Sequence, residues 1–157
     1  MKTARDFGPA AECEPAQSRS RLGTFANLRR SQAMGQRYTV LVVDDDPDVR
    51  LLAADFLAMS GYRVLEAADG NHALEIISAT HVDVLFTDIR MPRMDGLELA
   101  RRVERGQPGL RIIFTTGYSS KFPRGREALP WPIIRKPWRG WQLVEQVAKA
   151  LNQQEPG

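Results

Sequence analysis

Aspartates follow two short apolar runs of this chain, and their types and spacing suit metal-assisted chemistry. Residues 40–43 are all Val or Leu and lead into Asp44-Asp45-Asp46, whereas residues 84–87 lead into Asp88. Side chains at the carboxyl ends of parallel strands meet at one edge of an α/β sheet. If the two strands are neighbours, three or more carboxylates converge there. Two such charges about 4 Å apart repel by roughly 4 kcal/mol at an effective dielectric constant of about 20, so the cluster calls for a cation.

Oxygen ligands at this density suit a hard divalent ion, Mg²⁺ before Zn²⁺. A carboxylate beside such an ion can attack phosphorus and form an acyl phosphate. Thr116 and Lys136 end the next two predicted strands, and a hydroxyl and an ammonium group there can hold phosphoryl oxygens. Pro137 indicates a fixed peptide bond, cis or trans, that aims the lysine. The strand ends together therefore predict a site for phosphoryl chemistry.

Other reaction classes lack their residues. His72 and His81 lie away from the predicted strand ends, and we expect both at the surface rather than as ligands. This leaves no Ser/His/Asp or Cys/His nucleophile set. No Gly-rich loop of the Walker or dinucleotide type occurs, so a nucleotide cofactor is not indicated. A single cysteine, Cys13, excludes an internal disulfide.

Alternating strand and helix patterns begin at residue 38 and must position these groups. Strands are predicted over residues 40–43, 63–67, 82–87, 111–115 and 132–135. Helices are predicted between them from apolar stripes such as Val49, Leu52, Ala53 and Phe56. Asp46 suits a helix cap better than a metal ligand. The alternation predicts an α/β fold, a doubly wound five-stranded parallel sheet.

The connection between the last two predicted strands is irregular. Pro123, Gly125 and Pro130 leave little room for a full helix. We therefore expect the fourth helix of the fold to be short or disordered. The last helix is expected from about Arg139, with Val144, Val147, Ala148 and Leu151 on its buried face.

Charge and composition divide the chain into a tail and one domain. The 157 residues carry a formal charge of +3, and seven basic against three acidic residues precede Tyr38, which gives that segment +4 and leaves −1 for the rest. Residues 1–37 are predicted to be a disordered basic tail, residues 38–152 the domain and residues 153–157 a C-terminal tail. The tail is either a basic arm for an anionic partner or, as we favour, a solvated leader, with Met34 as a candidate true start. No apolar run predicts a membrane span or a secretory signal.

From residue 40 to about residue 151 the chain resembles a response regulator receiver domain of bacterial two-component signalling. The motifs that carry the resemblance are, in order, Leu41-Val42-Val43-Asp44-Asp45-Asp46, Asp88-Ile89-Arg90-Met91-Pro92-Arg93-Met94-Asp95-Gly96, Thr116-Gly117 and Lys136-Pro137. The resemblance implies a flavodoxin-like receiver fold. It also implies that Asp88 is the phospho-acceptor, Thr116 the switch hydroxyl and Lys136 the cation that senses the phosphoryl group. A Mg²⁺ ion is implied with four protein ligands: Asp88, Asp45 directly, Asp44 through water or in support, and the Arg90 backbone carbonyl.

Two departures from the usual receiver pattern affect the expected switch. Ile133 stands three residues before the lysine, where Tyr or Phe is usual. The run Phe114-Thr115-Thr116-Gly117-Tyr118 and the Pro/Gly-rich residues 122–132 resemble a subclass named for its Phe-Ala-Thr-Gly motif, which lacks the aromatic switch. The resemblance implies that residues 122–131 rearrange on phosphorylation, the alternative being a long ordered loop.

Three tryptophans surround the predicted fifth strand and last helix: Trp131, Trp138 and Trp141. They form either a partner-docking face or part of the core. Of the three, Trp138 is predicted to lie in the core and Trp141 to be exposed.

The expected function is a stand-alone signalling module rather than an enzyme. A sensor histidine kinase or histidine phosphotransfer protein would phosphorylate it, and a downstream protein partner would read the change. We expect a cytoplasmic monomer or weak dimer without direct DNA binding or membrane contact. Three alternatives are a Mg²⁺-dependent phosphohydrolase, a phosphorylation-independent scaffold and a detached receiver of a hybrid kinase. Against the phosphohydrolase, Arg90 stands two residues after Asp88, where a second carboxylate is needed.

Overall fold

The computed structural model describes residues 38–117 and 129–153. The predictions of a disordered tail over 1–37, a short or disordered fourth helix and most of the C-terminal tail lie outside these ranges. Within the described ranges, no helix has both the length and the apolar character needed to cross a membrane.

One parallel sheet of five strands, in the order β2-β1-β3-β4-β5, forms the centre of the described structure. The strands are β1 (Thr39–Val43), β2 (Arg63–Ala67), β3 (Val84–Asp88), β4 (Arg111–Thr116) and β5 (Ile133–Arg135). The ladder pairs Val43 with Thr87 across β1 and β3, and Asp88 with Thr115 across β3 and β4. The predicted sheet is confirmed, and β1 and β3 are neighbours, as convergence of the carboxylates requires.

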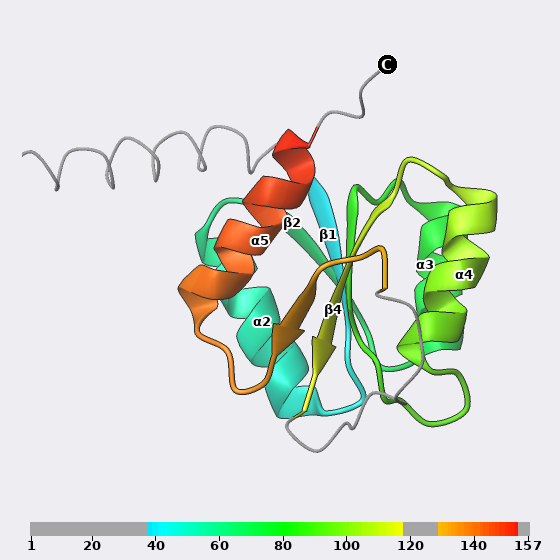
Figure 1. The fold of residues 1–157 in the computed structure, drawn as a ribbon, viewed down its shortest axis with the longest axis horizontal. Helices are drawn as coiled ribbons and strands as arrows, with labels where there is room; N and C mark the ends of the chain where they lie inside the picture. Colours follow the sequence, from blue (N-terminus) through cyan, green and yellow to red (C-terminus); the bar gives the residue numbers. More distant parts are fainter. Residues whose placement is uncertain (1–37, 118–128, 154–157) are drawn as a thin grey trace, which may run out of the picture.

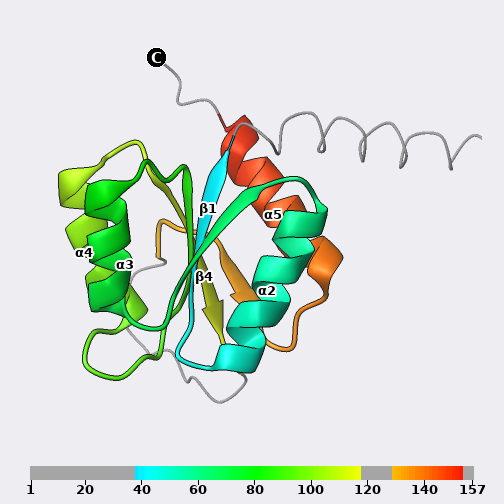
Figure 2. The same cartoon turned by 180° about the vertical axis from the view of Figure 1, so that it is seen from behind.

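Helices cover both faces of the sheet, as in a doubly wound fold (Figure 1 and, from behind, Figure 2). The helices described are α2 (Pro47–Met59), α3 (Gly70–Ala79), α4 (Gly96–Gly106) and α5 (Gly140–Asn152). α2 and α5 lie side by side on one face, and α3 and α4 lie on the other. From β1 the chain goes first to β2 on one side and then to β3 on the other side. Folds of this kind place ligand sites at the carboxyl ends of the two strands where this reversal occurs.

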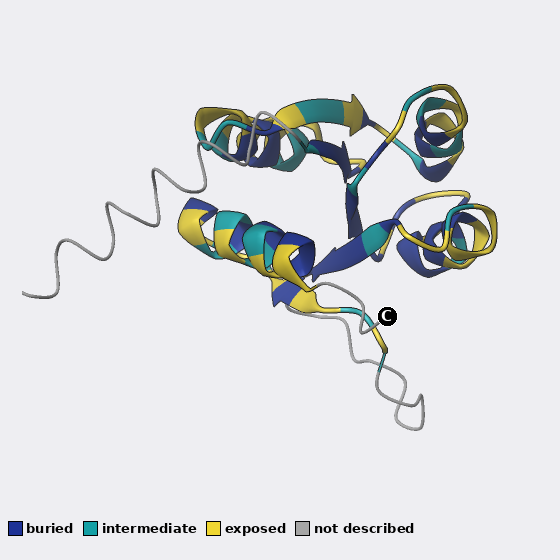
Figure 3. Cartoon of the chain, turned by 90° about the horizontal axis from the view of Figure 1, so that it is seen from above, coloured by how far each residue is buried: buried dark blue, intermediate teal, exposed yellow. Residues whose placement is uncertain are grey.

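Each face of the sheet has its own apolar core layer. Leu41 and Val43 point into the layer beneath α3 and α4, whereas Val40 and Val42 point into the layer beneath α2 and α5. β1 and β3 are buried along their whole length, which explains their unbroken apolar runs. Figure 3 shows the buried strands between helices whose outer sides are exposed.

Aspartates cap three of the helices directly after the strand-to-helix turns. The Asp46 side chain accepts hydrogen bonds from the backbone N–H groups of Asp48 and Val49, at 3.0 and 3.4 Å. Asp69 and Asp95 cap α3 and α4 in the same way. These caps satisfy N–H groups that have no partner inside the helix. The predicted role of Asp46 is confirmed.

Three local predictions were wrong. On α5, Leu143 and Ala150 are buried in place of Val144 and Ala148, which are only half-buried. The third strand begins at Val84 rather than at residue 82, because Val82 is buried in the core but lies before the ladder. Leu52 is 48% exposed, since α2 approaches the sheet through Ala53, Ala54 and Leu57 instead. In each case the sequence shows that the side chain is apolar. It does not show whether the backbone there joins the strand ladder, or which face of a helix contacts the sheet.

Candidate functional site

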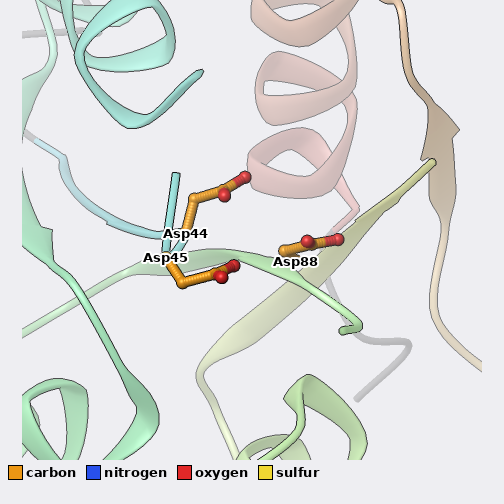
Figure 4. Close-up of side chains that lie close together, drawn as sticks. All are labelled: Asp44, Asp45 and Asp88. Atoms are coloured by element: carbon orange, nitrogen blue, oxygen red, sulfur yellow. The ribbon is translucent and has the colours of Figure 1, made fainter. Parts of the chain in front are cut away.

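Three aspartates gather at the carboxyl edge of the sheet. Asp44 and Asp45 directly follow β1, and Asp88 is the last residue of β3. One carboxylate oxygen from each lies within 4.8 Å of the others. Figure 4 shows the three side chains lying close together. Asp44 and Asp88 are only 2% and 8% exposed, whereas Asp45 is exposed, so the cluster has a buried base and an open side.

Backbone contacts fix the segment that carries Asp44. The Asp44 Oδ1 atom accepts a hydrogen bond from the Asp46 backbone N–H at 3.0 Å. The Arg50 Nη1 atom donates to the Asp44 backbone carbonyl at 2.7 Å. Sequence reasoning missed Arg50. The helical pattern places it in α2, but nothing in the spacing indicates which carbonyl its long side chain reaches.

Lys136 connects the far strand to the aspartates. Its Nζ atom lies 2.7 Å from Asp44 Oδ2 and 3.3 Å from Asp88 Oδ2. Its backbone N–H donates to the Thr116 carbonyl at 2.8 Å, which holds the lysine beside the end of β4. The peptide bond to Pro137 is cis. The ammonium group therefore offsets part of the negative charge of the cluster.

Burial and charge act in opposite directions on the two central groups. Burial raises the pKa of the Asp88 carboxyl, the Lys136 charge lowers it and the Asp44 charge raises it, with a net value above the ordinary one. Burial lowers the pKa of the Lys136 ammonium, but its hydrogen bonds and charge interactions with Asp44 and Asp88 outweigh this and raise it. Among the described residues, the buried Asp88 Oδ1 atom has no hydrogen-bond partner. A buried, unpartnered carboxylate oxygen beside two more carboxylates suits a hard cation ligated by oxygen.

The remaining residues that the sequence analysis names lie on β4, on β5 and in the loop after β3. Thr116 is buried at the end of β4, next to Thr115, the register partner of Asp88. Arg90 is exposed, and a backbone hydrogen bond from it lowers the pKa of the Asp88 carboxyl. Ligation of a metal by its carbonyl stays a prediction. Ile133 lies on β5 opposite Phe114 and is 37% exposed.

The tryptophans divide between core and surface. Trp138 is half-buried: its Nε1 atom donates to Thr115 Oγ1 at 3.2 Å, and its ring meets Phe86 edge-on with centroids 6.0 Å apart. Trp131 packs against the α3/α4 core layer. Trp141 is 61% exposed, as predicted. Trp138 thus borders the core behind the site rather than lying fully inside it.

Comparison with known proteins gives the family. Residues 40–148 match the model of the response regulator receiver domain. The chain is 34% identical over 119 residues to the response regulator receiver protein CpdR of Brucella abortus, covering 71% of this chain and 95% of that protein. It is 36% identical over 121 residues to the sensor kinase CckA of Brucella abortus, covering 74% of this chain but only 13% of the kinase. The crystal structure of the receiver domain from the hybrid histidine kinase CckA superposes with a TM-score of 0.62 at 32% identity, covering 72% of this chain and 98% of that domain.

The chain therefore belongs to the response regulator receiver domain family. The predicted fold and the predicted resemblance are confirmed. Members of this family are signalling modules of two-component systems and work with histidine kinases or phosphotransfer proteins. The chain matches nearly the whole of one relative and a small part of the other, so both a separate receiver and a receiver within a larger kinase have precedents among its relatives.

Proposed function

We propose that this chain is a phosphorylation-controlled signalling module that accepts a phosphoryl group on Asp88. The observation that carries the proposal is the Asp88 carboxylate itself, buried at the end of β3 with Oδ1 unpartnered in the described structure. Two further aspartates and one lysine surround it. A carboxylate oxygen that can act as a nucleophile, two more carboxylates suited to a metal ion and a cationic side chain thus lie at one edge of the sheet.

The transfer uses groups of this chain in distinct roles. A carboxylate oxygen of Asp88 attacks the phosphorus of a phosphohistidine, the phosphorus–nitrogen bond breaks and the imidazole leaves. Lys136, 3.3 Å from Asp88 Oδ2, then pairs with phosphoryl oxygens, and the Thr116 hydroxyl donates to one of them. Attack by water on the acyl phosphate later releases inorganic phosphate and restores the carboxylate.

Four ligand positions would hold a Mg²⁺ ion: the carboxylates of Asp44, Asp45 and Asp88 and the Arg90 backbone carbonyl. The three carboxylates offer oxygen donors within 4.8 Å of one another, which suits Mg²⁺. The bound ion supplies positive charge that offsets repulsion between the aspartates and an incoming phosphoryl group.

The output is a changed affinity for a downstream protein partner, or service as a phosphate sink. The 95% coverage of CpdR supports a stand-alone module, and the match to CckA supports the alternative of a receiver within a hybrid kinase. We place the module in the cytoplasm as a monomer or weak dimer, without direct DNA contact. We class it as a binding module rather than an enzyme, because exposed Arg90 occupies the position where a phosphohydrolase needs a second carboxylate.

Incubation with Mg²⁺ and acetyl phosphate, followed by intact mass spectrometry, tests the proposal. The wild-type protein should gain the mass of one phosphoryl group and lose it with time, whereas Asp88→Asn and a magnesium-free sample should gain none. No gain by the wild type, or an equal gain by Asp88→Asn, contradicts the proposal. Steady turnover of a small phosphomonoester favours the phosphohydrolase instead. Partner binding that Asp88→Asn leaves unchanged favours the scaffold.

A further inference from the structure

The loop over residues 89–95, between Asp88 and α4, is tied at its base to the sheet. The Ile89 backbone N–H donates to the Thr115 carbonyl at 3.0 Å, and the Gly96 N–H donates to the Ile89 carbonyl at 2.9 Å. These bonds close the loop next to Asp88. Arg90 directly follows this base, and residues 92–94 form the outer part of the loop, where the Met94 backbone N–H donates to the Pro92 carbonyl at 2.8 Å.

The outer part of the loop is attached to the start of α3. The Arg93 Nη2 atom lies 2.7 Å from Asp69 Oδ2, while Asp69 Oδ1 caps α3 by accepting from the His72 N–H at 3.0 Å. Met94 is 7% exposed and covers Gly70, where an added Cβ would lie 2.7 Å from the Met94 sulfur. We call these contacts of Asp69 and Gly70 with Arg93 and Met94 the loop clasp.

The backbone at Arg93 is in the left-handed conformation, which residues other than glycine rarely adopt. Its φ angle is 69°, and among the described residues no other non-glycine residue has a positive φ. A non-glycine residue stays in the left-handed region only where its surroundings impose it. The clasp supplies such a constraint, because it holds the residues on both sides of the Arg93–Met94 peptide bond.

We propose that Arg93 is a positioning residue for the metal site, acting through the loop clasp. By fixing the outer end of the loop to α3, it holds the Arg90 carbonyl close to the Asp44, Asp45 and Asp88 carboxylates. The inference rests on the proposed Mg²⁺ site. Partners that orient metal ligands from outside the coordination sphere commonly alter metal affinity without touching the ion.

Two substitutions remove the ion pair and keep the local backbone. Asp69→Asn retains the cap of α3, because Asn is as good a capping residue as Asp. Arg93→Asn removes the guanidinium, and Asn tolerates a positive φ better than most residues. Arg93→Gly is a second variant at that position that fits the φ angle without strain. The double variant Asp69→Asn/Arg93→Asn completes a thermodynamic cycle.

Titration with MgCl₂, followed by NMR shifts of the backbone amides, measures the affinity of each variant. If the ion pair acts by positioning the loop, both single variants and the double variant should bind Mg²⁺ equally weakly, about threefold less tightly than wild type. A threefold change corresponds to the free energy of an exposed ion pair. A purely electrostatic effect has a different signature. Removing the Arg93 charge would then strengthen Mg²⁺ binding, removing the Asp69 charge would weaken it, and the double variant would resemble wild type.

Arg102→Asn is the matched control, because Arg102 forms a 2.8 Å ion pair with Glu98 on the outer surface of α4. It should leave Mg²⁺ affinity unchanged. Thermal unfolding without Mg²⁺ shows whether each variant is folded at the titration temperature. Wild-type affinity in Arg93→Asn and Arg93→Gly overturns the inference and leaves the proposed function standing. A wild-type protein that does not bind Mg²⁺ overturns both.

Discussion

Lys136 is the residue on which the charge balance of the site depends. Its ammonium group is closer to Asp44 than to Asp88, at 2.7 against 3.3 Å, and both carboxylates are largely withdrawn from water. The shorter contact is to a proposed metal ligand rather than to the proposed phospho-acceptor. Without a metal ion, the lysine is therefore the main counter-charge of the buried part of the cluster.

Replacing Lys136 should make folding depend on magnesium. Lys136→Met leaves two buried carboxylates without their cation, so we expect a loss of about 2 kcal/mol in the free energy of unfolding without Mg²⁺, and a smaller loss with it. Urea denaturation at neutral pH with and without Mg²⁺ measures this. Lys149→Met is the control, since Lys149 pairs with Glu145 at 2.9 Å in an exposed position on α5. Equal losses in the two variants would contradict the prediction.

Asp88 should destabilise the magnesium-free protein at neutral pH. Because burial raises its pKa, the folded state binds the proton more tightly than the unfolded chain does. Stability therefore falls as pH rises from the ordinary value of 3.8 through the raised one, and the destabilisation is fully present above it. Asp88→Asn should therefore raise the free energy of unfolding at neutral pH and leave it unchanged below the ordinary pKa.

Urea denaturation of Asp88→Asn in magnesium-free buffer, at neutral pH and at a pH below 3.8, tests this dependence. Glu75→Gln, which neutralises an exposed carboxylate on α3, is the control and should show little gain at either pH. A loss of stability at neutral pH, or the same gain at both, would contradict the explanation by burial.

At the scale of elements, α4 starts unusually close to the site. A Cβ atom built on Gly96, its first residue, would lie only 2.1 Å from the Asp88 backbone carbonyl oxygen. The last residue of the same helix, Gly106, has nothing within 4 Å of such an atom. Gly96 is therefore required, because the backbones of α4 and β3 approach closely there. Gly106 is not required for this reason.

Alanine at these two glycines should have opposite effects. Gly96→Ala should destabilise the protein by about 3 kcal/mol, because backbone atoms rather than a flexible side chain must move. Gly106→Ala should be neutral or stabilise it by up to about 1 kcal/mol, since Ala favours helix over Gly. Thermal or urea unfolding of both variants measures the difference. A tolerated Gly96→Ala would show that the start of α4 can shift away from β3.

The sequence predicts these elements well because the strands and caps are local signals. The apolar runs before Asp44 and Asp88 mark β1 and β3, and their adjacency brings the carboxylates together as expected. Contacts made by long charged side chains could not be predicted in this way. Arg50 reaches the Asp44 carbonyl and Arg93 reaches Asp69 through rotamers that tertiary packing selects. The spacing of residues along the chain therefore does not predict these two contacts.

For the molecule as a whole, the site joins distant parts of the chain. The Lys136–Asp44 contact spans 92 positions and links β5 to β1 across the intervening strands. Such a contact exists only when the complete sheet has formed. Occupation of the site should therefore stabilise the entire domain rather than one loop.

Magnesium should raise the unfolding temperature of the wild-type protein. At a Mg²⁺ concentration tenfold above the dissociation constant, we expect about 1.4 kcal/mol of added stability. Asp45→Asn should remove most of this gain with little effect on the metal-free protein, because the Asp45 side chain is exposed. Thermal unfolding over a MgCl₂ series, with NaCl at matched ionic strength as the control, measures both. An equal rise in NaCl would contradict specific binding.

The two outer strands of the sheet also bear on how the protein behaves in a crowded cell. β5 is only three residues long and lies between Pro132 and Pro137, neither of which has an N–H to offer a neighbouring chain. β2, at the opposite border, exposes the charged side chains of Arg63 and Glu66. Short, proline-flanked or charged borders disfavour the addition of a foreign strand. We therefore expect little strand addition between copies of this chain at either border of the sheet.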